Sequence, residues 1–60
     1  LSTLTKREQE IAVLVSDGKT NIEIAKALNV AEITVKKSLS NIYARLGITN
    51  RAALASMISV

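Results

Sequence analysis

Four residues that could bind a partner through polar and apolar contacts share one side of a predicted helix: Ile33, Lys36, Lys37 and Ser40. At about 100° per residue, this side lies next to an apolar stripe and is not part of it. An ammonium group donates hydrogen bonds and carries a positive charge, and a serine hydroxyl both donates and accepts. The set therefore suits a partner that is rich in negative charge and hydrogen-bond acceptors.

The helix that carries these residues is predicted over 32–46, and its buried stripe consists of Val35, Leu39, Ile42 and Leu46. A shorter helix is predicted over 21–28. Between them lies the turn Asn29-Val30-Ala31, in which Asn tolerates the left-handed backbone that ends a helix. Two short helices joined in this way form a helix-turn-helix unit, whose second helix lies in the major groove of DNA.

Two further helices are predicted, over 6–17 and 51–59. The start of a helix is marked twice by the spacing of a capping box, at Thr5 with Glu8 and at Thr20 with Glu23. Either Thr49 or Asn50 is expected to cap the last helix, and Glu8 is expected to pair with Arg51. The predicted fold is all-α: a compact four-helix domain containing a helix-turn-helix, with helices near 6–17, 21–28, 32–46 and 51–59.

The composition narrows the classes of function. The 60 residues include no Cys and no His, so disulfides and soft metal sites are excluded and the commonest general base is missing. The acidic residues are scattered and no glycine-rich phosphate loop is present, so we expect no enzyme and no cofactor. No apolar run is long enough to span a membrane. Eight Lys or Arg against five Asp or Glu give a net charge of +3, which favours a polyanionic partner.

With these residues in view, the chain resembles the DNA-binding domain of the LuxR/FixJ-type (GerE-like) bacterial transcription regulators. The resemblance covers nearly the whole chain. It rests on an ordered set of short motifs: Leu4-Thr5-Lys6-Arg7-Glu8, Gly18, Thr20-Asn21, Glu23-Ile24-Ala25, Leu28, Thr34-Val35-Lys36, Asn41-Ile42, Arg45-Leu46-Gly47-Ile48 and Arg51. Each motif alone is common, and the ordered set is specific.

The resemblance implies four helices, of which the third enters the major groove and the fourth pairs two copies on DNA. Lys36, Lys37 and Ser40 match the family's base-reading positions, and Thr20, Asn21 and Thr34 match positions that touch phosphate or hold the turn. Three positions depart from the common pattern: Ile22 where a basic residue is common, Ala31 where Ser or Thr usually caps the helix, and Ser38 where His is usual.

Other assignments follow from the residues themselves. Ile33 could pack on a thymine methyl group or extend the core, and Lys19 could add attraction to DNA phosphate. The last predicted helix is apolar nearly all round, and one of its sides carries Ala53, Met57 and Val60. This side could join two copies in a homodimer, or a neighbouring domain could cover it.

The expected function is sequence-specific binding of double-stranded DNA in transcription regulation, by residues 1–60 as a single domain and a C-terminal fragment of a longer regulator. The family points to RNA polymerase as a further partner, to the cytoplasm, and to a phosphorylated receiver (as in a response regulator) or a ligand sensor upstream. A helical protein–protein adaptor and a sigma-factor-like promoter-reading domain are the alternatives.

Overall fold

The computed structural model describes residues 4–58 and contains four helices in that range, with no strand. They are α1 (Lys6–Ser16), α2 (Asn21–Leu28), α3 (Glu32–Leu46) and α4 (Arg51–Ile58). The predicted all-α fold is therefore confirmed. The first helix ends one residue earlier than predicted, because Asp17 serves as its C-cap, and position 59 lies outside the described residues.

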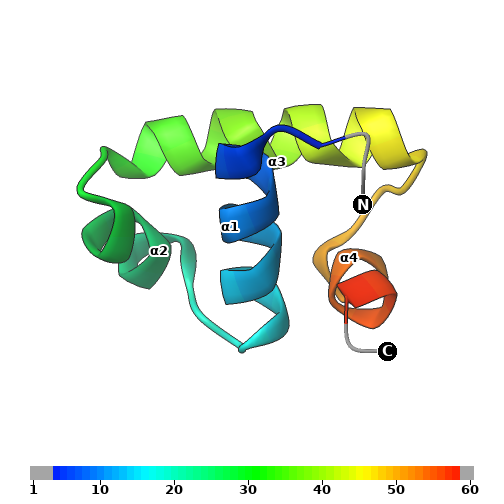
Figure 1. The fold of residues 1–60 in the computed structure, drawn as a ribbon, viewed down its shortest axis with the longest axis horizontal. Coiled ribbons are helices and arrows are strands. Elements are labelled where there is room, and N and C mark those ends of the chain that lie inside the picture. Colours follow the sequence, from blue (N-terminus) through cyan, green and yellow to red (C-terminus); the bar gives the residue numbers. More distant parts are fainter. Residues whose placement is uncertain (1–3, 59–60) are drawn as a thin grey trace.

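The four helices pack around α1. Figure 1 shows α3 extending along one side of the molecule, with α1 crossing beneath it and with α2 and α4 on opposite sides of α1. Contacts join α1 to each of the other three helices and join α2 to α3. This arrangement leaves the side of α3 that points away from α1 uncovered by any other helix among residues 4–58.

The core is aliphatic. Its buried side chains are Leu4, Ile11, Ala12, Val15, Ile24, Ala25, Val35, Leu39, Ile42 and Leu54. The spacing of apolar residues predicts a buried stripe of Ile11, Leu14 and Val15 in α1 with Ala12 at its edge, and this prediction is wrong for Leu14 and Ala12. Ala12 is fully buried while Leu14 is only half-buried, because α1 is packed by helices on several sides and not by one.

Both capping boxes form as predicted. The Thr5 hydroxyl accepts the N–H of Glu8 at 3.2 Å, and the Glu8 carboxylate accepts the N–H of Thr5 at 3.0 Å. The same exchange joins Thr20 and Glu23, at 3.2 and 2.8 Å. Each box satisfies two backbone donors that a helix start leaves free, so α1 and α2 begin at defined residues.

The turn between α2 and α3 has the geometry that the sequence predicts. Asn29 adopts a left-handed backbone with φ of 58°, and the N–H of Val30 donates to the carbonyl of Ala25 at 2.9 Å. Val30 is half-buried and packs against the core. The turn is therefore closed and anchored, and it fixes the angle between the two helices of the helix-turn-helix.

The connection between α3 and α4 begins with a left-handed residue and ends with a side-chain cap. Gly47 ends α3 with a φ of 69°, which a residue with a side chain rarely adopts. The side-chain oxygen of Asn50 accepts the N–H of Ala53 at 2.8 Å, so Asn50 is the cap of α4. Leu54 is the fully buried residue of this helix among those whose side chains are described, and it anchors α4 to the core.

Candidate nucleic-acid interface

The outer edge of α3 consists of the residues that lie between those facing the core. Val35, Leu39 and Ile42 point into the core and are almost completely buried. A helix turns by about 100° per residue, so the residues between these three must point outwards or sideways. The packing of α3 therefore determines which of its side chains can meet a partner.

All four residues predicted to contact DNA bases lie on this exposed side: Ile33, Lys36, Lys37 and Ser40. Ile33 is 60% exposed, so it does not extend the core, which was one of its two predicted roles. An apolar side chain at this exposure on a polar helix face is free to pack on an apolar group of a partner. Two ammonium groups, a hydroxyl and an isoleucine thus lie together on the exposed side of α3.

Two further exposed residues, for which the sequence predicted no contact with DNA, extend this edge. Asn41 lies one turn after Lys37, and Ala44 lies one turn after Ser40. An asparagine amide can donate and accept together, which allows a bidentate contact with adenine. The spacing of four residues from Lys37 was the signal that could have identified Asn41.

The start of α3 lacks a side-chain cap, as the alanine predicts. Ala31 has the extended backbone of an N-cap residue but makes no side-chain hydrogen bond. Thr34, a predicted phosphate contact, is exposed and its N–H donates to the carbonyl of Ala31 at 3.0 Å. The helix start therefore keeps unsatisfied backbone donors near Thr34, which favour an anion there.

The predicted phosphate contacts Lys19, Thr20 and Asn21 lie together at the start of α2. The Thr20 hydroxyl oxygen accepts from Glu23, which leaves its O–H hydrogen to donate elsewhere. The side-chain oxygen of Asn21 accepts a hydrogen bond from Arg51 at 2.8 Å. The guanidinium of Arg51 also donates to the carbonyl of Lys19.

Arg51 does not pair with Glu8, so that prediction is wrong. Glu8 lies in the first turn of α1, beside α3, whereas Arg51 begins α4 and reaches the connection between α1 and α2. Glu8 instead pairs with Arg45, whose Nη1 lies 3.0 Å from Oε1 of Glu8. The charge of Arg45 thus balances a buried carboxylate.

An ionised carboxylate lies close to the cations at the start of α2. The backbone N–H of Thr20 bonds the Glu23 carboxylate and holds the pKa of Glu23 below its ordinary value, with smaller contributions from Lys19 and Lys26. Glu23 is therefore negatively charged at neutral pH. It therefore offsets part of the positive charge of Lys19 at this end of α2.

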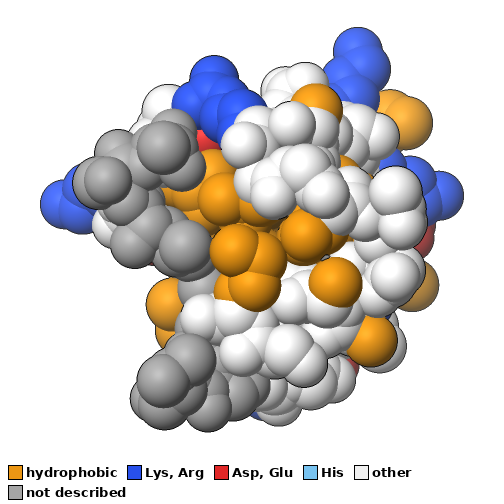
Figure 2. Space-filling model, turned by 90° about the vertical axis from the view of Figure 1, so that its right-hand side faces the viewer, with side chains coloured by type: hydrophobic (Ala, Val, Ile, Leu, Met, Phe, Trp, Pro, Cys, Tyr) orange, Lys and Arg blue, Asp and Glu red, His pale blue; other side chains and the backbone are white. Residues whose placement is uncertain are grey.

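The face that carries α4 shows apolar groups at its surface (Figure 2). Met57 is 40% exposed and Ala53, one turn earlier, is half-buried. These two residues share a side of α4, as the sequence predicts for a pairing surface. The third member of the predicted surface, Val60, lies outside the described residues.

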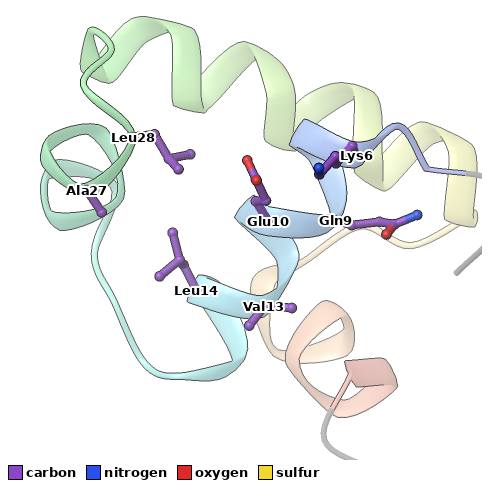
Figure 3. Close-up of a pocket in the computed structure, with 7 residues that line it drawn as sticks. All are labelled: Lys6, Gln9, Glu10, Val13, Leu14, Ala27 and Leu28. Atoms are coloured by element: carbon purple, nitrogen blue, oxygen red, sulfur yellow. The ribbon is translucent and has the colours of Figure 1, made fainter.

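An open, mostly apolar groove of about 540 Å³ lies between α1 and α2 (Figure 3). Leu14 of α1 faces Ala27 and Leu28 of α2 across it. None of the predicted site residues lines this groove. Over residues 4–58, the acidic side chains form no group of three that could hold a metal ion, and no helix is long and apolar enough to cross a membrane.

Known proteins share this sequence pattern. Residues 2–58 match the family described as bacterial regulatory proteins, luxR family. The chain is 38% identical over its whole length to the putative HTH-type transcriptional regulator YhjB of Escherichia coli (strain K12), of which it covers 30%. It is 41% identical over its whole length to the probable transcriptional regulatory protein SgaR of Hyphomicrobium methylovorum, of which it covers 29%.

A third relative is the transcriptional regulatory protein LiaR of Bacillus subtilis (strain 168), which is 43% identical over 88% of this chain. The match covers 25% of LiaR, so the chain spans less than a third of the length of each of these three relatives. All three relatives are named as transcriptional regulators or transcriptional regulatory proteins. Since the family model matches almost the whole sequence, the chain belongs to the luxR family of bacterial regulatory proteins.

Proposed function

We propose that this chain is the DNA-binding output domain of a longer transcriptional regulator and that it places α3 in the major groove of its operator. The observation that carries the proposal is that Lys36 and Lys37 are exposed on α3, outside the stripe of residues that the helix buries in the core. Recognition helices of the helix-turn-helix class read bases from such an edge near their N-terminus.

Base recognition is assigned to Lys36, Lys37, Ser40 and Ile33. Lysine donates to the O6 and N7 atoms of guanine, and an exposed isoleucine can contact the methyl group of thymine. Lys19, Thr20, Asn21 and Thr34 are assigned to phosphate groups on either side of the groove. Phosphate contacts fix the position of the protein, and base contacts supply the preference for a sequence.

Two copies are proposed to meet on DNA through Ala53, Met57 and Val60 of the α4 region. The partly exposed Met57 supports this assignment for the described residues. A two-fold dimer places its recognition helices about 34 Å apart, which is one turn of the duplex. The operator is then a pair of half-sites with that spacing.

The remaining assignments rest on the family. The domain is proposed to act in the bacterial cytoplasm, to work with RNA polymerase, and to respond either to a phosphorylated receiver or to a ligand sensor in the same regulator. A sigma-factor domain would not need the fourth helix, and the family match that extends to residue 58 favours the regulator.

A protein–protein adaptor is the competing function, because Ile22 and Ile33 are 53% and 60% exposed. A titration of duplex binding against salt separates the two. For a DNA reader the logarithm of the association constant falls linearly with the logarithm of the salt concentration, by roughly 0.9 per phosphate neutralised. Absence of duplex binding at low salt, or binding with no salt slope, contradicts the proposed function and favours the adaptor.

A further inference from the structure

Arg51 connects three parts of the fold that are separate in the sequence: the start of α4, the start of α2 and the connection between α1 and α2. Its Nη1 donates to Oδ1 of Asn21 at 2.8 Å, and its Nη2 donates to the carbonyl of Lys19. The N–H of Lys19 donates in turn to the carbonyl of Leu14 at 3.1 Å. The first residue of α4 therefore holds the start of α2 against the end of α1.

This contact determines how the Asn21 amide is turned. A guanidinium group has only donors, so the atom of Asn21 that faces it must be the oxygen and not the nitrogen. The amide nitrogen then occupies the other branch of the side chain. Within residues 4–58 it donates to no protein atom, so both of its hydrogens are left for a partner.

Two backbone donors lie beside the Asn21 amide at this end of α2, and the Glu23 carboxylate there accepts the N–H of Thr20. The Thr20 hydroxyl and the Thr20 carbonyl accept from Glu23 and Ile24, respectively. The N–H groups of Asn21 and Ile22 precede the first intrahelical bond, so the geometry of a helix gives them no acceptor. The Asn21 nitrogen thus adds a side-chain donor to two backbone donors.

We propose that Arg51 is a positioning residue for DNA: it holds the Asn21 amide so that the NH₂ group faces a backbone phosphate. This inference rests on the proposed function, because it requires that the start of α2 lies against the duplex. It also gives Arg51 a role through Asn21 and not through direct contact with DNA.

The test uses duplexes in which single phosphates are replaced by uncharged methylphosphonates. Affinity of the 60-residue chain is measured for each position of a selected duplex. The phosphate that Asn21 contacts is the one whose replacement weakens the wild type but not Asn21→Ala. We expect a loss of about tenfold for the wild type at that position, the size of one hydrogen bond to a charged group.

Arg51→Gln is then examined at the same phosphate. The proposal predicts that this variant, like Asn21→Ala, no longer senses the replacement, because its amide side chain is too short to hold Asn21. It is overturned if Arg51→Gln keeps the wild-type sensitivity there, or if it loses sensitivity at a different phosphate, which would indicate a direct contact by Arg51.

Two further variants separate positioning from stability. Asn21→Asp keeps an oxygen for Arg51 and stays folded, but it replaces the NH₂ group by a second oxygen, so it must lose the contact. Arg51→Lys keeps the positive charge and one donor. It takes the place of Arg51→Gln in the phosphate measurement if Arg51→Gln unfolds. If no phosphate distinguishes Asn21→Ala from the wild type, the inference fails, whereas the proposed function fails only if the wild type shows no salt-dependent duplex binding.

Discussion

Oε1 of Glu8 lies 3.0 Å from Nη1 of Arg45 and also accepts the N–H of Thr5. The carboxylate is buried and receives one donor from its own helix start and one from the far end of α3. It therefore ties the position of α3 to the first turn of α1. Because α3 carries the proposed DNA-reading edge, this ion pair helps to set the direction in which that edge points.

Replacing Glu8 by Gln should destabilise the fold by about 1–3 kcal/mol, because a buried hydrogen-bonded charge is lost and with it the ion pair to Arg45. The free energy of unfolding in urea measures the effect. Glu10→Gln is the matched control, since Glu10 pairs with Arg7 at 3.4 Å on the surface, where such pairs contribute under about 1 kcal/mol. Equal losses in the two variants would contradict a structural role for the Glu8–Arg45 pair.

The features that depend on residues close together in the sequence were predicted correctly. Both capping boxes, the left-handed Asn29 and the exposed lysines of α3 follow from spacings of three or four residues, and all are observed. The partner of Glu8 was predicted wrongly as Arg51. That pairing depends on how α3 and α4 approach α1, and no local pattern in the sequence carries this information.

The uncapped start of α3 leads to a second prediction. Ala31 already has the extended backbone that an N-cap needs, so Ala31→Ser should add a hydroxyl acceptor and stabilise the fold by about 1 kcal/mol. Urea unfolding measures the gain. Ala27→Ser, at an exposed position inside α2, should instead be neutral or slightly destabilising. No difference between the two serines would argue against an unsatisfied helix start.

The capping carboxylate of Glu23 should make stability depend on pH. Its pKa in the folded protein is lowered by the N–H of Thr20, with smaller effects of Lys19 and Lys26. The stabilisation is therefore complete above the ordinary pKa of 4.5 and is lost as pH falls through the lowered folded value.

Glu23→Gln provides the measurement for this prediction. The wild type should be more stable than the variant near neutral pH, and the difference in the free energy of unfolding should shrink as pH falls to about 3. A difference that stays constant or grows over this range would show that the ionised form of Glu23 is not the stabilising one.

The proposed pairing through α4 predicts a difference between two kinds of DNA. Met57→Asp should weaken binding to paired half-sites more than binding to a single half-site, because a charge at the centre of a small apolar contact opposes its burial. Ser56→Asp adds the same charge on an exposed position about 100° away around the helix and should have less effect. Equal losses on both duplexes would exclude this side of α4 as the dimer contact.

The most direct test of the DNA-reading edge is the affinity of Lys36→Ala for a selected duplex and for a scrambled duplex at the same salt concentration. Losing the lysine contact should cost about 1–3 kcal/mol on the selected sequence and much less on the scrambled one. Lys26→Ala, an exposed lysine of α2, should leave the preference unchanged. If Lys36→Ala retains the full wild-type preference for the selected sequence, Lys36 does not read bases and the proposed orientation of α3 is contradicted.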